Sequence, residues 1–165
     1  MVLKVVTEGA AEIMVQGGPD RTIIDRKYEL YGSDLSFFTQ KTLAALQWYF
    51  SGQFVNLNKT QENKEELETR SGTHQIPVLI TPENWCIADS TPIFRLLDSR
   101  LPAPRLYPCD ALTACVVALL EEYFDEWMAR LTVHTRWYYE ESAIFAASAM
   151  LRSQGVPADQ VMHRS

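Results

Sequence analysis

Cysteine is scarce in this chain of 165 residues, which contains three: Cys86, Cys109 and Cys115. Their number is odd, they are scattered, and no pair is separated by just two residues. This pattern argues against a disulfide framework and against a structural zinc site built from cysteine ligands. We therefore expect a reduced, cytoplasmic protein without a metal site.

The sequence also lacks a basic block, a long apolar run and a signal-peptide pattern at its start. Its 15 lysines and arginines are outnumbered by 21 aspartates and glutamates, which gives a net charge of −6. We therefore expect no nucleic-acid partner and no membrane partner that is bound through phosphate neutralisation. The longest apolar stretch, Ala111–Leu120, is too short for a bilayer-spanning helix, which needs about 20 residues.

What the sequence does contain is an ordinary globular composition, with 47% hydrophobic and 22% charged residues. Residues 1–26 carry little pattern, and we interpret them as an amino-terminal extension, with an extra β-hairpin as the alternative. Beyond them, Tyr28–Tyr31 alternates like a strand, Phe37–Phe50 has helical periodicity, and Phe54–Leu57 has the pattern of a second strand. A strand, a helix and a strand within about 30 residues form a βαβ unit, so the two strands should be parallel.

Four further elements follow this unit. A helix is predicted over Gln61–Arg70, and strands over Ile76–Ile80 and Trp85–Ile87. The short turn between these strands predicts an antiparallel hairpin, and Asp89 is placed to cap the next helix. Residues 27–100 are thus predicted to form an α/β domain with the order β-α-β-α-β-β-α.

The remainder of the chain has a different pattern. Residues 101–109 contain three of the eight prolines and are interpreted as a linker. The segment 110–165 is predicted to be all helical, with one long helix from Asp110 to about Leu131 and another over Ser142–Arg152. Because the apolar positions of the long helix form a wide stripe at a spacing of three or four, we expect it to be buried over much of its circumference.

Four short motifs follow one another along the chain: Leu30–Ser36, Gln75–Leu79, Ala88–Ile93 and Leu106–Asp110. In this order and spacing they resemble the cytosolic glutathione transferase family. The resemblance covers residues 27–135 and implies a thioredoxin-like domain followed by a helical domain. It also implies glutathione as co-substrate with no bound cofactor, an unidentified electrophilic substrate, and a homodimer. A full helical domain has at least four or five helices, so the chain would carry only part of one.

The resemblance assigns one end of glutathione to the segment before the third strand. In the family this proline is cis, which implies a cis peptide bond between Ile76 and Pro77. Ile76 would then pair its backbone N–H and C=O with glutathione like an added strand. His74, and more weakly Gln75, would contact the glycine carboxylate. The alternatives are an ordinary proline at a strand start and a solvated loop histidine.

The other end of glutathione is assigned to Asp89 and Ser90. A helix N-terminus offers free N–H groups and a positive dipole end to a carboxylate. The resemblance implies that Ser90 holds the γ-glutamyl carboxylate and that Asp89 holds the amino group. The alternative is a plain helix cap.

The predicted chemistry depends on a hydroxyl group beside the thiol. A free thiol has a pKa near 8.5, and a hydroxyl donating to the sulfur near a helix start favours the thiolate. Ser36 matches the activating serine of serine-type members, and Tyr31 is the rival; they could equally be a helix cap and a core aromatic. The sequence thus predicts a glutathione transferase-like protein that binds glutathione and activates its thiol. The alternative is a non-catalytic binding or assembly module of the same family.

Overall fold

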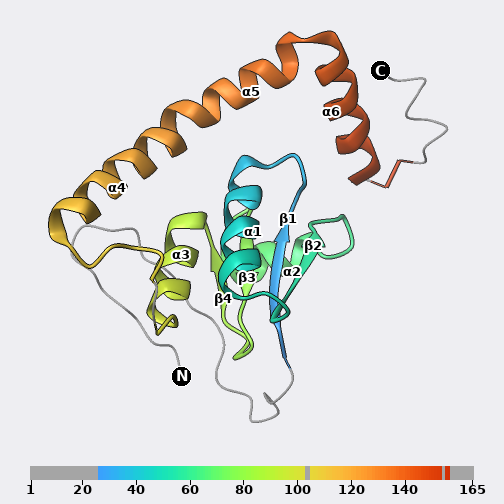
Figure 1. Ribbon diagram of the computed structural model, residues 1–165. Coiled ribbons are helices and arrows are strands. Elements are labelled where there is room, and N and C mark those ends of the chain that lie inside the picture. Colours follow the sequence, from blue (N-terminus) through green and yellow to red (C-terminus); the bar gives the residue numbers. More distant parts are fainter. Residues whose placement is uncertain (1–25, 103–104, 154, 157–165) are drawn as a thin grey trace. The chain divides into compact units, whose positions relative to one another are not determined.

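The computed structural model describes residues 26–102, 105–153 and 155–156 (Figure 1). Nearly all of the predicted amino-terminal extension, residues 1–25, lies outside the described residues. The chain divides into two compact units, with the division between Ile93 and Phe94.

The first unit has the element order and strand directions that the sequence predicted. Its elements are β1 (Tyr28–Gly32), α1 (Phe37–Tyr49), β2 (Phe54–Asn58), α2 (Lys64–Ser71), β3 (Val78–Ile80), β4 (Cys86–Ala88) and the first turn of α3 (Ser90–Ser99). The strands form one sheet in the order β2-β1-β3-β4. β1 is parallel to β2 and antiparallel to β3, and β3 is antiparallel to β4. This mixed sheet with its helices is the predicted thioredoxin-like α/β fold.

One face of the sheet is covered by α1 (Figure 1). Leu30 of β1 and its partner Leu79 of β3 are completely buried there. Side chains alternate along a strand, so Tyr28 shares this face, and its ring meets that of Phe50 at the end of α1 edge to face, with centroids 5.3 Å apart. These contacts form the larger part of the core.

The opposite face is covered by α2, which is only eight residues long. Leu67, the one strongly apolar residue of α2, is buried in a cluster with Val78, Ile80 and Cys86. Tyr31 of β1 packs against this cluster. The strand thus sends alternate residues to two separate clusters, as its two-residue period requires.

The second unit is helical, as predicted, with different helix bounds. After the end of α3 it contains α4 (Ala111–Tyr123), the π-helical turn η2 (Phe124–Met128), α5 (Ala129–Tyr138) and α6 (Glu140–Ser153). Asp110 caps α4 by accepting a hydrogen bond of 2.8 Å from the Thr113 N–H. The predicted long helix therefore starts where expected but continues through the π turn to Tyr138. No helix within the described ranges is both long and apolar enough to cross a bilayer.

The expected burial of the long helix is wrong. Neither α4 nor η2 has a buried residue, and Leu112, Leu119 and Trp127 are 75%, 67% and 64% exposed. Helical periodicity identifies an apolar stripe, but it carries no information on whether another element covers that stripe.

Candidate glutathione site

Three segments of the chain meet at one end of the sheet. The register of β1 with β3 pairs Tyr31 with Val78, so Gly32 lies opposite Pro77. Val78 is also opposite the last residue of β4, so Asp89 follows directly beside Pro77. The Asp89 N–H donates a hydrogen bond of 3.1 Å to the Pro77 carbonyl. The predicted site residues on these segments are therefore held at the same edge.

The segment before β3 has the predicted backbone geometry. The peptide bond between Ile76 and Pro77 is cis, which confirms that expectation. Pro77 is buried and Ile76 is half-buried. Within the part of the chain that the structure describes, no hydrogen bond reaches the N–H or C=O of Ile76. Both groups remain available to an extended ligand that adds to the strand edge.

The start of α3 combines a buried hydroxyl with an exposed acid. Ser90 is 1% exposed, whereas the Asp89 side chain is in solvent. The Asp89 carboxylate accepts from the Thr91 N–H at 3.4 Å and from the Ser90 hydroxyl at 3.5 Å, so the residue does cap the helix. Its φ of +74° is a left-handed conformation that costs most L-residues energy and that is concentrated at functional sites.

Ser36 caps α1 and follows the end of β1, at Gly32, by four residues. Its Oγ accepts a hydrogen bond of 3.2 Å from the Thr39 N–H. A hydroxyl has one proton to donate and two lone pairs; the cap uses a lone pair, and no described residue accepts the proton. Capping the helix therefore uses a lone pair of Ser36, whereas donation to a thiol would use its proton, so the two roles are compatible.

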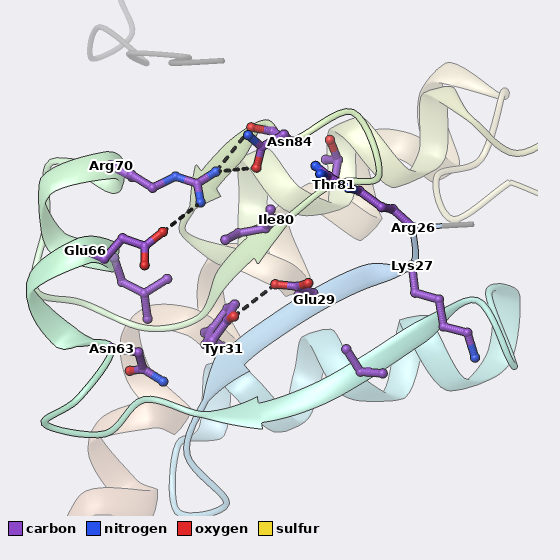
Figure 2. A pocket seen from close by; sticks show the side chains of 12 residues that line it. Arg26, Lys27, Glu29, Tyr31, Asn63, Glu66, Arg70, Ile80, Thr81 and Asn84 are labelled. Carbon is purple, nitrogen blue, oxygen red and sulfur yellow. Dashed lines mark hydrogen bonds and ion pairs between the residues drawn. The ribbon is translucent and has the colours of Figure 1, made fainter. Parts of the chain in front are cut away.

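Tyr31 lies on the α2 face of the sheet, with its hydroxyl directed at Glu29 (Figure 2). The hydroxyl donates to the Glu29 carboxylate at 2.9 Å. Burial and the adjacent carboxylate raise the pKa of Tyr31 to about 12. Because its proton is already donated to Glu29, this geometry does not favour Tyr31 as the group that activates a thiol.

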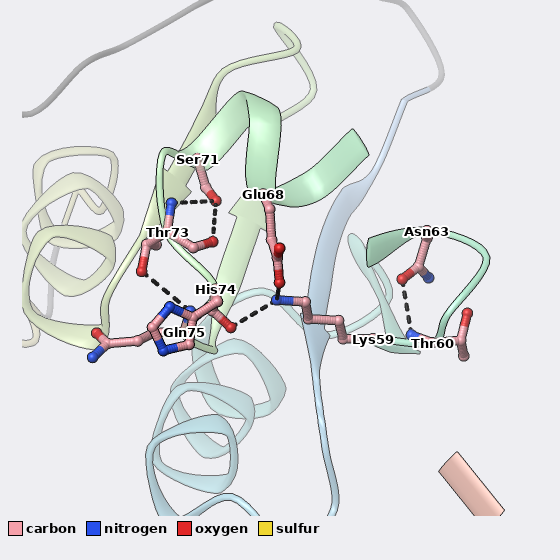
Figure 3. A network of polar contacts seen from close by, with 8 residues as sticks. All are labelled: Lys59, Thr60, Asn63, Glu68, Ser71, Thr73, His74 and Gln75. Carbon is pink, nitrogen blue, oxygen red and sulfur yellow. Dashed lines mark hydrogen bonds and ion pairs between the residues drawn. The ribbon is translucent and has the colours of Figure 1, made fainter. Parts of the chain in front are cut away.

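The loop that carries His74 and Gln75 is held by a lysine (Figure 3). Lys59, which directly follows β2, donates to the His74 carbonyl at 2.7 Å and to the Glu68 carboxylate at 2.9 Å. The lysine ammonium lowers the pKa of Glu68. The side chains of His74 and Gln75 are exposed, and the Gln75 amide points away from the lysine (Figure 3).

Lys59 is the residue of this edge that the sequence analysis missed. Its backbone N–H also donates to the Gly32 carbonyl at 2.8 Å, so it connects β1, α2 and the His74 loop. A signal was available, because parallel strands end at the same edge and Lys59 is the cation that immediately follows β2.

The chemistry of this edge is that of an anion and peptide site. It offers free backbone groups at Ile76, the amino-terminal end of α3, and a hydroxyl proton at the amino-terminal end of α1.

Cys86 is not a candidate nucleophile, because burial raises the pKa of its thiol. Among the described residues, no three histidine, cysteine or acidic side chains gather into a group that could hold a metal ion.

Comparison with known proteins shows which proteins this chain resembles. Residues 30–105 match the model of the glutathione S-transferase amino-terminal domain, whereas no curated protein matches the chain in sequence. One similar structure is a glutathione S-transferase of Methylobacterium radiotolerans in complex with glutathione sulfonate. It is 21% identical with a TM-score of 0.54, and the match covers 60% of this chain and 47% of that one.

Two further structures cover more of the chain. A glutathione transferase family member from Pseudomonas fluorescens with bound glutathione is 16% identical, with a TM-score of 0.53 over 83% of this chain and 63% of that one. Ure2p in complex with glutathione is 16% identical, with a TM-score of 0.58 over 84% of this chain and 66% of that one. The chain therefore spans between about half and two thirds of these structures. Its residues 30–105 match the model of the glutathione S-transferase amino-terminal domain, and the chain shares the thioredoxin-like fold of these structures.

Proposed function

We propose that this protein binds glutathione along the edge formed by Gly32, Pro77 and Asp89. The cysteinyl backbone would pair with the free N–H and C=O of Ile76, and the γ-glutamyl end would lie at Ser90 and Asp89. The observation that carries the proposal is the unpaired backbone of Ile76 beside the start of α3. The glutathione and glutathione sulfonate in three similar structures support it.

We further propose that Ser36 donates its hydroxyl proton to the sulfur of bound glutathione. The positive end of α1 adds to this effect, because it stabilises negative charge near the first turn. The thiolate would then attack an electrophilic carbon. The carbon–sulfur bond forms as a leaving group departs with its bonding electron pair or, at an activated double bond, as the π-electron pair moves to the neighbouring atom and takes up a proton from water. His74 and Gln75 would contribute at the glycine end, where Lys59 acts through the loop as a positioning residue.

A second candidate function is a non-catalytic binding or assembly module, for which homodimer formation is one form. The uncovered apolar stripe of α4 and η2 favours this candidate, since exposed apolar surface of this extent is typical of a contact with another chain. Both candidates share the glutathione site and differ in whether Ser36 changes the acidity of the thiol.

The test of glutathione binding is calorimetric titration of Ser90→Ala and Asp89→Asn. Asparagine tolerates a positive φ and keeps a cap acceptor, so the second variant removes the charge with little backbone penalty. Each change removes a hydrogen bond to a charged group, worth about 1.5–3 kcal/mol, or roughly a tenfold to hundredfold loss of affinity. Ser99→Ala, at the other end of the same helix, is the matched control. Wild-type affinity in both variants would contradict the proposed site.

A further inference from the structure

A cavity lies in the same unit, on the face of the sheet that α2 covers only in part. Its volume is about 440 Å³, within the range of about 300–1,000 Å³ that is usual for small-molecule sites. Residues that precede β1 and that follow β3 line the part of it at the end of the sheet opposite the Gly32–Pro77–Asp89 edge, and Tyr31 and Asn63 line the part nearer to that edge. Of the candidate glutathione residues, it includes only the rival Tyr31.

The floor of this cavity holds a carboxylate with a single partner (Figure 2). Glu29 is half-buried and accepts one hydrogen bond, from the neutral hydroxyl of Tyr31. No cation in the described part of the chain forms an ion pair with it. A partly desolvated carboxylate with one neutral donor is incompletely compensated, and a cation is its chemical complement.

Two of the three basic residues that line the cavity interact with other groups, and the third is directed away from its centre. Arg70 donates to the Glu66 carboxylate at 3.3 Å and to the Asn84 side chain at 2.9 Å. The side chain of Lys27 extends away from the centre of the cavity (Figure 2), and Arg26 has other interactions. An anionic ligand would therefore have to displace the partners of Arg70 or reach Lys27, which points away from the centre, whereas a cationic ligand would give the Glu29 carboxylate the charged partner that it lacks.

The walls next to Glu29 are apolar. Val55, Leu67 and Ile80 line the cavity together with the ring of Tyr31, and Val55 is 38% exposed. An aromatic ring would also receive a cation favourably on its face. The site therefore offers one negative group beside a surface that gains by covering a short hydrocarbon or aromatic body.

We propose that this cavity is a binding site for a small organic amine, whose ammonium group pairs with Glu29 while its apolar part packs on Val55, Leu67 and Ile80. The proposal concerns a site separate from the proposed glutathione site and does not depend on it.

The experiment uses the full chain with methyl groups labelled for nuclear magnetic resonance. Benzylamine is the probe, and benzyl alcohol is its uncharged control of nearly the same shape. We expect benzylamine to shift the methyl signals of Val55, Leu67 and Ile80 in a saturable manner. The alcohol should bind at least tenfold more weakly. Equal binding of the two compounds, or no shift at these methyl groups, would overturn the proposal.

Three variants test whether the effect depends on the Glu29 carboxylate. Glu29→Gln keeps the size and an acceptor for Tyr31, and it should weaken benzylamine at least tenfold. Glu66→Gln, the matched control, removes an acid of the same cavity that is already paired with Arg70, and it should change affinity less than twofold. Tyr31→Phe keeps the ring and the Glu29 charge, so binding should persist, provided that the spectrum shows the wild-type fold. An unchanged affinity in Glu29→Gln would contradict the assignment.

Discussion

The two units of this chain use similar apolar side chains in opposite ways. In the first unit Leu30, Leu46, Val78, Leu79 and Ile93 are completely buried. In the second unit the large apolar side chains are mostly exposed. Among the described residues of α4, η2, α5 and α6, Ala146 alone is buried. The apolar spacing of α1 and of α4 is comparable, so the difference does not come from the local sequence pattern.

The difference follows from what each element packs against. The sheet presents two apolar faces, and α1 and α2 each cover one of them within a single compact unit. A helix stripe becomes a core only when another element supplies the opposing surface. The proposed glutathione site is built entirely on the well-packed unit, where the backbone positions of Pro77 and Asp89 are set by sheet register and by a direct hydrogen bond.

The largest expected effect is on the stability of this packed core. Leu30→Ala should lower the free energy of unfolding by about 2–5 kcal/mol, because it removes a completely buried side chain and leaves a cavity. Leu119→Ala, in the 67% exposed stripe of α4, is the matched control and should change it by no more than about 0.5 kcal/mol. Urea denaturation of both variants measures the contrast. A loss above about 2 kcal/mol in Leu119→Ala would show that the stripe is covered in solution.

The features of the fold that could be predicted depend on local sequence patterns and on the pairing of neighbouring strands. Strand alternation at Tyr28–Tyr31, the proline of the third strand, and the polar caps Ser36, Asp89 and Asp110 each specify an element start or end. The short turn after β3 specifies the hairpin. These features bring the site segments together because the ends of neighbouring strands lie side by side at one end of the sheet.

The other features of the structure depend on contacts between residues, which the local sequence pattern does not reveal. The exposure of α4 depends on which surfaces are present to cover it, and the π turn at Phe124–Met128 depends on how the helix accommodates one extra residue. The partnership of Tyr31 with Glu29 depends on side-chain direction, although their spacing of two residues placed both on one face. Lys59 was missed because a single lysine after a strand is not part of a recognisable sequence motif.

An intermediate effect is expected at the close packing between β1 and α1. A Cβ atom added at Gly32 would overlap the side chain of Thr39, so Gly32→Ala should cost about 1–3 kcal/mol of stability. The overlap involves both the methyl group and the hydroxyl of Thr39. Thr39→Ala removes both groups, and in that background Gly32→Ala should cost less. A double-mutant cycle by denaturation measures the coupling, which should be about 0.5 kcal/mol or more. Additive effects would contradict the packing of α1 on this strand.

A smaller effect should appear in the alkaline stability of the first unit. The pKa of Tyr31 rises from about 10 to about 12 in the fold, so the unfolded chain loses this proton first. The stabilising contribution is complete below pH 10 and is lost as the pH rises through 12. Tyr31→Phe should therefore show a shallower fall in unfolding free energy between pH 10 and 12 than the wild type. Identical slopes would contradict the raised pKa of Tyr31, which burial and the Glu29 carboxylate cause.

The most direct test of the account is the acidity of glutathione bound to the protein. Thiolate absorbance of the complex, followed against pH, gives the pKa of the bound thiol. The account predicts a pKa below that of free glutathione in the wild type, a return upward in Ser36→Ala with nearly unchanged affinity, and little change in Tyr31→Phe. An unshifted pKa in the wild type would identify a binding module instead, and a shift that survives Ser36→Ala but disappears in Tyr31→Phe would contradict the role given to Ser36.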